Sequence, residues 1–312
     1  VNRKVHLILE NENNQSRYLE QEASARPRRF TAQWNDDIHH VLHTAVTGER
    51  EGYYADYTGD TEKLGRALAE GFAFQGEIMP YRGDKRGQPS AHLPPTAFIA
   101  FLQNHDQIGN RAFGERISVL TTAAAVCAAA AVYLLMPEIP MLFMGEEWNA
   151  TEPFPFFCDF GPDLADAVRE GRREEFSKFP EFQNPERRNH IPDPQAESTF
   201  EAAKLRWNTK GASQVEWRKW YQRILTARRE HVIPLIPKIT HGGEYQVVAA
   251  SAVAVRWRAG DEELTLSANL SAAIVHGFAP GFSTDDRHII WQEGEIGDDG
   301  TFGPWTVRWR IS

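Results

Sequence analysis

The chain has few cysteines and lacks long runs of charge of one sign. Cys127 and Cys158 are the only cysteines among 312 residues, too few for a disulfide framework, so we expect a reducing, cytoplasmic location. The formal net charge is −9, and lysines and arginines are scattered along the sequence. This balance argues against nucleic acid or an anionic membrane surface as a partner.

The sequence also lacks a secretory signal, and no stretch is a good membrane span. The residues before Glu10 are strand-like rather than basic and then apolar. Only Ile117–Met136 is uncharged over the length of a span, but it is mostly alanine and threonine and Pro137 follows directly. We therefore expect a buried helix there. Because the chain opens with Val1 inside strand-like sequence, we expect it to be a fragment of a longer protein.

What the sequence does contain is a series of short apolar runs separated by helical patterns. The runs are Val5–Leu9, Phe30–Trp34, Ala97–Gln103 and Met141–Met144. Strands that are apolar throughout and alternate with helices are typical of a parallel sheet with helices outside. The intervening periodicity predicts helices over Asp36–Val46, from Asp60 or Thr61 to Glu70, and over the alanine-rich stretch.

The second half of the chain changes character twice. Residues 149–208 are irregular and rich in proline and phenylalanine, which predicts a long functional loop with a short helix near Leu164–Phe176. An amphipathic helix is expected over Ser213–Arg229. After Pro237, short alternating runs between glycine and aspartate turns predict a small β domain of the sandwich type. We therefore expect two domains, residues 1–237 and 238–312.

Carboxylates follow several of the apolar runs. Glu10 comes after the first run, Asp106 after the third, and Glu146 with Glu147 after the fourth. The carboxyl ends of parallel strands meet at one edge of a sheet, and barrels present catalytic groups there. Glycoside cleavage needs one protonated and one ionised carboxyl group in a common pocket. The pattern therefore predicts a cleft lined by acids.

Four stretches carry a resemblance to a known family. NHDQIGNR (Asn104–Arg111) resembles the fourth sequence region of the α-amylase family of glycoside hydrolases, and LILENE (Leu7–Glu12) resembles its third. LFMGEEW (Leu142–Trp148) is similar to the end of the last barrel strand, and WNDDIHHVLH (Trp34–His43) to a stretch of the trehalohydrolase branch. The resemblance implies an α/β fold, the C-terminal part of a (β/α)8 TIM barrel followed by a small all-β domain.

The resemblance also implies roles for individual residues. Glu10 corresponds to the general acid/base, and Asp106 to a catalytic carboxylate that binds the sugar beside the scissile bond. The alternative for Glu10 is a surface glutamate without a catalytic role. The other residues expected to contact substrate are His105, Asn104, Gln107, Trp34, Asp37, His39 and Glu146. For Glu146, a structural hydrogen bond to a neighbouring loop is an equal alternative.

We expect no metal and no cofactor. The stretch Trp34–His43 holds three histidines and two aspartates, and His39 and His43 stand four residues apart. The order HExxH and a cysteine partner are both missing, however. Lining of a substrate pocket, or a helix surface, explains these histidines better than a metal site.

One catalytic group of the family has no counterpart here. The family places its nucleophilic aspartate in an Arg-x-Asp setting on the strand before the acid, but in this chain the acid-bearing run already begins at Val5. The only Arg-x-Asp, Arg82-Gly83-Asp84, lies in a glycine-rich loop. We therefore expect these residues to be inactive alone and to need the missing N-terminal half of the same protein as a partner.

The resemblance implies a retaining glycosidase that releases trehalose from maltooligosyltrehalose by hydrolysing the α-1,4 bond next to the trehalose unit. Such an enzyme acts in carbohydrate metabolism, specifically trehalose biosynthesis. Two alternatives stay open. The first is another activity of the family on an α-glucan, such as glycogen branching or debranching. The second is a non-catalytic carbohydrate-binding fragment, which the missing nucleophile would explain.

Overall fold

The computed structural model describes residues 5–22, 29–177, 179–207, 210–278 and 288–312. These residues form two compact units. Unit 1 comprises the described residues within 1–102, 123–141 and 221–312. Unit 2 comprises those within 103–122 and 142–220.

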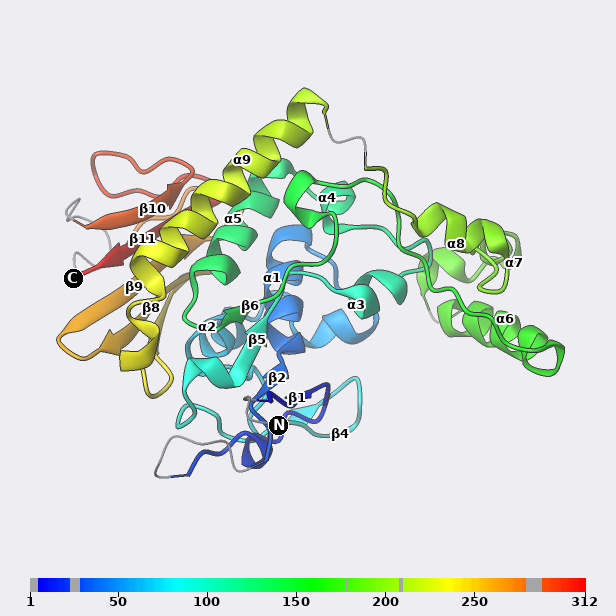
Figure 1. Cartoon of the computed structure of the whole chain (residues 1–312), viewed down its shortest axis with the longest axis horizontal. Coiled ribbons are helices and arrows are strands. Elements are labelled where there is room, and N and C mark those ends of the chain that lie inside the picture. Colours follow the sequence, from blue (N-terminus) through cyan, green and yellow to red (C-terminus); the bar gives the residue numbers. More distant parts are fainter. Residues whose placement is uncertain (1–4, 23–28, 178, 208–209, 279–287) are drawn as a thin grey trace. The chain divides into compact units, whose positions relative to one another are not determined.

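A four-stranded parallel sheet lies in unit 1 (Figure 1), in the order β1-β2-β5-β6. The strands are β1 (Ile8–Leu9), β2 (Ala32–Trp34), β5 (Phe98–Ala100) and β6 (Ile139–Pro140). All three neighbouring pairs run parallel, as the alternation of apolar runs and helices predicts. The carboxyl ends of the four strands therefore share one edge of the sheet.

The first and fourth runs differ from the sequence prediction. Val5–Leu9 is not a buried strand: only Ile8–Leu9 pairs, and Val5 is 66% exposed. The reason is its position, because β1 is an edge strand that pairs only with β2 within the described residues. The fourth strand lies before Met141–Met144, and its pairing with β5 ends where the Met141 N–H donates to the Ala100 carbonyl (2.8 Å).

Three helices of unit 1 correspond to predicted helical stretches. They are α1 (Asp36–Thr47), α2 (Thr61–Glu70) and α5 (Ala123–Leu135). Ile117–Met136 is not one helix, however: α4 (Ile117–Leu120) ends at Thr121, whose backbone is extended, and α5 begins at Ala123. The Asp60 carboxylate accepts a hydrogen bond from the Lys63 N–H (2.9 Å) and so caps α2. Gly71 ends α2 at a φ of +99°, where an added Cβ would lie 2.4 Å from the Phe98 ring, so only glycine fits. Short elements of the same unit are η1 (Ser16–Tyr18), η2 (Gly52–Asp56), β3 (Ile78–Met79), β4 (Asp84–Lys85), η3 (Pro95–Ala97) and η7 (Ile236–Lys238).

The C-terminal part of unit 1 is a five-stranded antiparallel sheet in the order β10-β11-β9-β8-β7. Its strands are β7 (Glu244–Ala249), β8 (Ala252–Ala259), β9 (Glu262–Asn269), β10 (Ile289–Glu293) and β11 (Thr306–Ile311). Trp257 and Trp309 are buried and stack at 5.7 Å, and the Trp309 indole donates to the Ala131 carbonyl of α5 (2.9 Å). The predicted all-β part is confirmed, and its sheet packs on α5 (Figure 1). The described residues of this part form a single five-stranded sheet, so its sandwich type stays a prediction, as does the domain boundary at residue 237.

Unit 2 contains mainly short helices and loops. Its elements are α3 (His105–Gly109), α4 (Ile117–Leu120), η4 (Glu146–Trp148), α6 (Pro162–Phe176), η5 (Pro180–Phe182), α7 (Pro185–Arg188) and α8 (Glu197–Ala203). The predicted helix near Leu164–Phe176 corresponds to α6. The core of this unit includes Phe176, Phe182 and Ile191, and the Arg172 guanidinium donates to the Arg111 carbonyl (2.9 Å).

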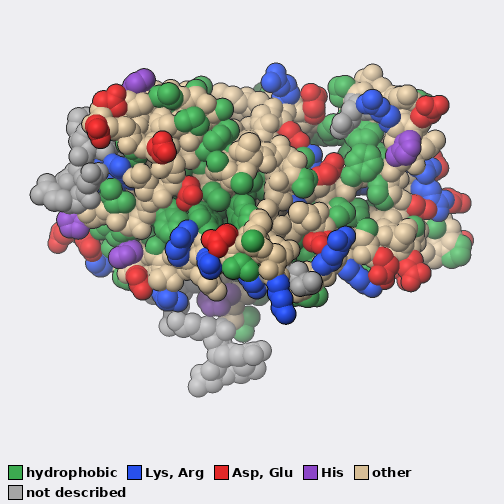
Figure 2. Space-filling model, turned by 90° about the horizontal axis from the view of Figure 1, so that it is seen from above, with side chains coloured by type: hydrophobic (Ala, Val, Ile, Leu, Met, Phe, Trp, Pro, Cys, Tyr) green, Lys and Arg blue, Asp and Glu red, His purple; other side chains and the backbone are tan. Residues whose placement is uncertain are grey.

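The amphipathic helix predicted over Ser213–Arg229 is α9 (Ala212–Ala227), which continues as a π-helical turn, η6 (Arg228–Val232). Across the described residues, no helix combines the length and the apolar character needed to cross a membrane. Acidic and basic side chains are interspersed on the face shown in Figure 2, in keeping with the scattered charges of the sequence.

Arg228 joins the π-helical turn to the end of α5. It is buried, and its guanidinium donates to three carbonyl oxygens, those of Leu134 (2.8 Å), Met136 (2.5 Å) and Glu138 (2.6 Å). These carbonyls lie at and beyond the end of α5, where helical partners are missing. Burial lowers the pKa of Arg228 to about 10, with Glu138 opposing the effect, so the side chain stays charged at neutral pH.

Replacing Arg228 with Met should therefore destabilise unit 1. We expect the free energy of unfolding to fall by about 3 kcal/mol, because buried carbonyls lose charge-assisted hydrogen bonds. Urea denaturation of the extended chain, meaning these residues with any coding sequence upstream of Val1, measures the change. The control is Arg229→Met at the exposed neighbouring position. An equal loss of unfolding free energy in Arg228→Met and Arg229→Met would contradict the stabilising role of Arg228.

Candidate functional site

The predicted site residues of unit 1 follow β1 and β2 at the shared edge of the parallel sheet. Glu10 comes directly after β1 and is exposed. Trp34 ends β2, is half-buried, and meets Phe101 edge to face with ring centroids 6.1 Å apart. Because β1 and β2 are parallel neighbours, the backbone presents Glu10 and Trp34 at the same edge.

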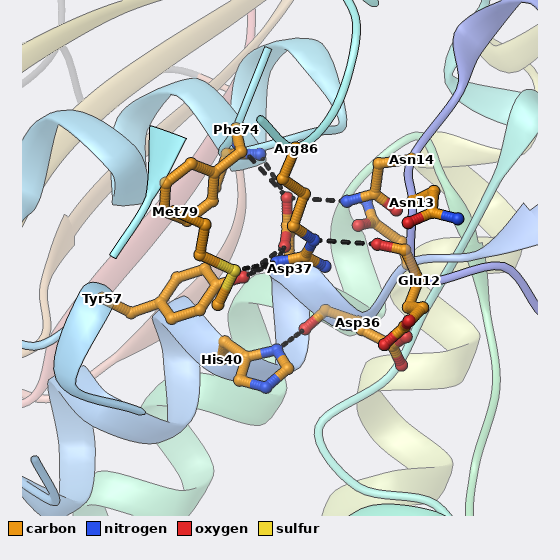
Figure 3. A network of polar contacts seen from close by, with 12 residues as sticks. Glu12, Asn13, Asn14, Asp36, Asp37, His40, Tyr57, Phe74, Met79 and Arg86 are labelled. Carbon is orange, nitrogen blue, oxygen red and sulfur yellow. Dashed lines mark hydrogen bonds and ion pairs between the residues drawn. The ribbon is translucent and has the colours of Figure 1, made fainter. Parts of the chain in front are cut away.

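Asp37 lies in the first turn of α1 and is the centre of a buried polar network (Figure 3). Its side chain is 0% exposed. One carboxylate oxygen, Oδ2, accepts hydrogen bonds from the Asn14 side-chain amide (3.0 Å) and the Ala73 N–H (2.7 Å). The other, Oδ1, accepts from the Tyr57 hydroxyl (2.7 Å). A direct contact between Asp37 and a sugar stays a prediction.

Arg86 supplies the counter-charge of this network. Its guanidinium lies 2.9 Å from Asp37 Oδ1, is only 4% exposed, and also donates to the Tyr57 hydroxyl. Burial alone would lower the pKa of Arg86, but Asp37 and Tyr57 outweigh burial and raise it. Burial, with Asp37, raises the pKa of Tyr57 well above its usual value. The phenol therefore remains protonated and able to donate.

Sequence reasoning missed both Arg86 and Tyr57. Arg86 falls in the region 76–95, which reads as a glycine- and proline-rich loop, and a lone arginine there carries no distinctive signal. The structure shows a β3–β4 hairpin followed by a tight turn at Gly87. Gly87 has a φ of +78°, and an added Cβ would lie 1.7 Å from the Phe74 carbonyl oxygen. Gly87 is therefore required by a close approach to the Phe74 carbonyl, a tertiary contact that the sequence alone does not reveal.

The histidines of α1 contact neighbouring protein groups. His39 is buried, with Nδ1 2.6 Å from the Leu102 carbonyl and Nε2 2.9 Å from the Tyr54 hydroxyl. His43 Nε2 lies 2.8 Å from a carboxylate oxygen of Glu49. Over the described ranges, no group of three or more histidine, cysteine or acidic side chains is placed to hold a metal ion. A sugar contact of His39 stays a prediction.

The third histidine of α1, His40, borders the Asp37 network. Its ring stacks on Tyr57 with centroids 4.6 Å apart, and its Nδ1 lies 2.6 Å from the Asp36 carbonyl. Burial lowers the pKa of His40 to about 4, and the nearby Arg86 charge lowers it further, against Asp37. His40 is therefore neutral at physiological pH.

The predicted site residues after β5 lie in unit 2, on and before α3. Asn104 caps this helix, because its side-chain oxygen accepts from the N–H groups of Asp106 (2.8 Å) and Gln107 (3.2 Å). His105 and Asp106 are exposed in the first turn, whereas Asn104 and Gln107 are buried. The Asn110 amide donates to Asp106 (2.9 Å). The motif thus forms a capped turn that presents His105 and Asp106 outward.

Glu146 lies in η4 of unit 2 and is buried. Its carboxylate accepts a hydrogen bond from the Phe143 N–H (3.2 Å), three residues earlier in the same segment. The nearby Arg116 is also buried and donates to the carbonyls of Glu152 (2.7 Å) and Met144 (2.9 Å). Burial lowers the pKa of Arg116, and Glu146 opposes the shift. Contact of Glu146 with substrate stays a prediction.

The structure thus places the predicted residues in two groups. Glu10, Trp34, Asp37 and His39 belong to unit 1, and the Asn104–Gln107 motif and Glu146 to unit 2. Asp37, His39, Asn104, Gln107 and Glu146 are buried, whereas Glu10, His105 and Asp106 are exposed. A common cleft for Glu10 and Asp106 stays a prediction.

Comparisons with known proteins point to one family. The chain is 40% identical over 200 residues to the malto-oligosyltrehalose trehalohydrolase of Deinococcus radiodurans, covering 63% of this chain and 33% of that protein. It is 37% identical over 249 residues to the Mycobacterium tuberculosis protein of the same name, covering 77% of this chain and 41% of the relative. The chain is thus similar to the C-terminal portion of proteins of this name over 200 to 249 residues. It spans less than half the length of these curated relatives.

A solved structure shows the same fold. The crystal structure of a Salmonella typhimurium protein, provisionally assigned as an alpha amylase, matches with a TM-score of 0.89 and 36% identity, covering 100% of this chain and 52% of that one. Residues 240–309 match a family model described as a domain of unknown function, DUF3459. Together with the two sheets described above, these findings show the C-terminal part of a (β/α)8 barrel followed by a small all-β domain.

The low pKa of His40 predicts a pH dependence of stability. An unfolded histidine titrates near 6.5, whereas folded His40 titrates at about 4. Between these values the unfolded state binds more protons, so the free energy of unfolding falls as the pH is lowered through this window, by up to about 3 kcal/mol. Urea unfolding of the extended chain at pH 7 and pH 4.5 measures the loss, which His40→Gln should reduce. The control, His92→Gln at an exposed position, should leave the loss of stability unchanged. Identical losses in the parent, His40→Gln and His92→Gln would refute the role of His40 in the pH dependence.

Proposed function

We propose that this chain is the acid-bearing half of a retaining glycoside hydrolase of the α-amylase family that releases trehalose from maltooligosyltrehalose. The observation that carries the proposal is the position of Glu10. It is an exposed carboxylate directly after an edge strand of a parallel barrel sheet, the place where such barrels carry catalytic groups. The names and the 37–40% identity of the curated relatives support the substrate.

In the proposed reaction, the carboxyl group of Glu10 protonates the glycosidic oxygen that leaves with trehalose. A nucleophilic carboxylate forms a bond to the anomeric carbon of the maltooligosaccharide as the carbon–oxygen bond breaks. Glu10, now ionised, then takes a proton from water, and the resulting hydroxide displaces the enzyme carboxylate with overall retention. Asp106 and His105 hydrogen-bond the reacting sugar, and Trp34 offers an aromatic face beside it. We propose a cytoplasmic location.

The nucleophile is proposed to lie upstream of Val1. Arg82-Gly83-Asp84 does not provide it, since Arg82 and Gly83 form the tight turn after Met79 and Asp84 is part of the two-residue strand β4. We therefore expect the 312 residues alone to release no trehalose from maltooligosyltrehalose, whereas the extended chain should do so. Measurable trehalose release by the isolated chain would contradict this expectation.

Substitution of the proposed acid tests the assignment in the extended chain. Glu10→Gln should lower kcat on maltooligosyltrehalose by about 10²- to 10⁴-fold, because general acid–base assistance is lost. The matched control is Glu12→Gln, an exposed glutamate two residues further along, which should retain activity. Trehalose release measured by chromatography separates the variants, and a Glu10→Gln enzyme as active as the parent would refute the role of Glu10.

The same assay distinguishes the nearest alternative. A branching or debranching enzyme would act on glycogen and leave maltooligosyltrehalose uncleaved. We expect the opposite: trehalose released from maltooligosyltrehalose and little change in glycogen. Binding of maltooligosaccharide by the extended chain with no product from either substrate would favour a non-catalytic carbohydrate-binding protein.

A further inference from the structure

The backbone that follows Glu10 is held in place from several directions. The Gln33 amide, in β2, donates to the Asn11 carbonyl (2.9 Å), and the Arg86 Nε donates to the Glu12 carbonyl (2.8 Å). The N–H of Gly87 donates to the Asn13 carbonyl (3.2 Å). We call residues 11–14 the acid-following segment. The Gln88 N–H donates to the Asn14 carbonyl (3.0 Å), so all four carbonyl groups of the segment have partners from β2 or from the turn after β4.

The fourth residue of the segment, Asn14, is held through its side chain. Its amide oxygen accepts from the Gln33 amide (2.8 Å), and its amide nitrogen donates to Asp37 Oδ2 (3.0 Å). Asn14 is buried and has a φ of +49°, in the left-handed region. Asparagine and glycine adopt this conformation most readily, so the turn itself depends on this residue.

Asp37 connects these contacts (Figure 3). One of its oxygens holds Asn14 and the Ala73 N–H, and the other holds Tyr57 and the guanidinium of Arg86. Arg86 in turn reaches the Glu12 carbonyl. A single buried carboxylate therefore links the acid-following segment to α1, to the residues after α2 and to the turn after β4.

Glu10 depends on its flanking backbone for direction because its side chain is exposed. On one side β1 pairs with β2 over only two residues. On the other side lies the acid-following segment. The pairing of β1 is short, so the segment supplies much of the restraint on the Glu10 backbone. A general acid must hold its proton within hydrogen-bond reach of the leaving oxygen, and small displacements are costly.

We propose that Asp37 is a positioning residue: through Asn14 and Arg86 it fixes the acid-following segment and thereby orients Glu10 toward the leaving oxygen. The inference rests on the proposed role of Glu10. It gives Asp37 an action on the reaction that is transmitted through the backbone, in addition to a structural role in unit 1.

The test is dependence on the leaving group. Trehalose needs a proton to leave, whereas fluoride leaves with little help from a general acid. The measured quantity is kcat/KM, because it reports the step in which the leaving group departs and not the later hydrolysis, in which Glu10 acts as a base for both substrates. In the extended chain, Asn14→Gly and Asp37→Asn should each lower kcat/KM on maltooligosyltrehalose by about 10- to 100-fold, but lower kcat/KM on maltotriosyl fluoride by only about two- to threefold. Glu10→Gln should show a still larger difference between its slowing on maltooligosyltrehalose and its slowing on maltotriosyl fluoride.

Two features of the design keep the test decisive. Asn14→Gly leaves the Asp37–Arg86 ion pair and the left-handed backbone intact, so it reports even if Asp37→Asn does not fold. Asp60→Asn makes the same chemical change at the cap of α2, where the carboxylate accepts hydrogen bonds from the backbone and the side chain of Lys63. This control should slow neither substrate by more than about twofold, as for a surface polar change.

The outcomes separate the two proposals. Equal slowing on both substrates by Asn14→Gly, or no slowing on either, would overturn the positioning role of Asp37 while leaving Glu10 as the acid. Equal slowing on both substrates by Glu10→Gln would contradict the role of Glu10 itself, and the positioning role would fall with it. Leaving-group dependence in both variants, with an unaffected Asp60→Asn, supports the inference.

Discussion

The ion pair between Asp37 and Arg86 is the contact on which the region around Glu10 depends. Both side chains are almost completely buried, and their charged atoms lie 2.9 Å apart. Buried charges are costly to desolvate, so such a pair persists only when hydrogen bonds satisfy its remaining oxygens and N–H groups. Here Asn14, Ala73 and Tyr57 satisfy the carboxylate and the Glu12 carbonyl satisfies the guanidinium. The pair thereby joins segments that are far apart in sequence.

A second constraint is that the parallel sheet is open at both edges within the described part of the chain. Its edge strands β1 and β6 carry Ile8 and Ile139, which are 41% and 38% exposed. Unpaired strand edges with exposed apolar side chains favour pairing with further strands, and closing a barrel removes such edges. This is the physical basis for the proposal that the chain requires additional strands both to fold stably and to acquire a nucleophile.

Much of this architecture follows from local sequence. The parallel sheet, α1, α2 with its Asp60 cap and Gly71 end, α6 and the C-terminal antiparallel sheet all correspond to short-range patterns. Strand limits were less predictable: Val5–Leu9 is apolar, yet only two of its residues pair, because burial depends on neighbours that a local pattern does not specify. The same holds for Asp37, whose partners Tyr57, Ala73 and Arg86 lie 20 to 49 positions further along the chain. Their network is a tertiary property, and the motif around Trp34–His43 identified only its centre.

We propose that Glu10 protonates the glycosidic oxygen next to trehalose. The decisive measurement is a crystal structure of the extended chain carrying Glu10→Gln with bound maltooligosyltrehalose. We expect the residue 10 side chain within hydrogen-bond distance of the glycosidic oxygen next to trehalose. A substrate whose glycosidic oxygen lies out of reach of residue 10 would refute the role of Glu10.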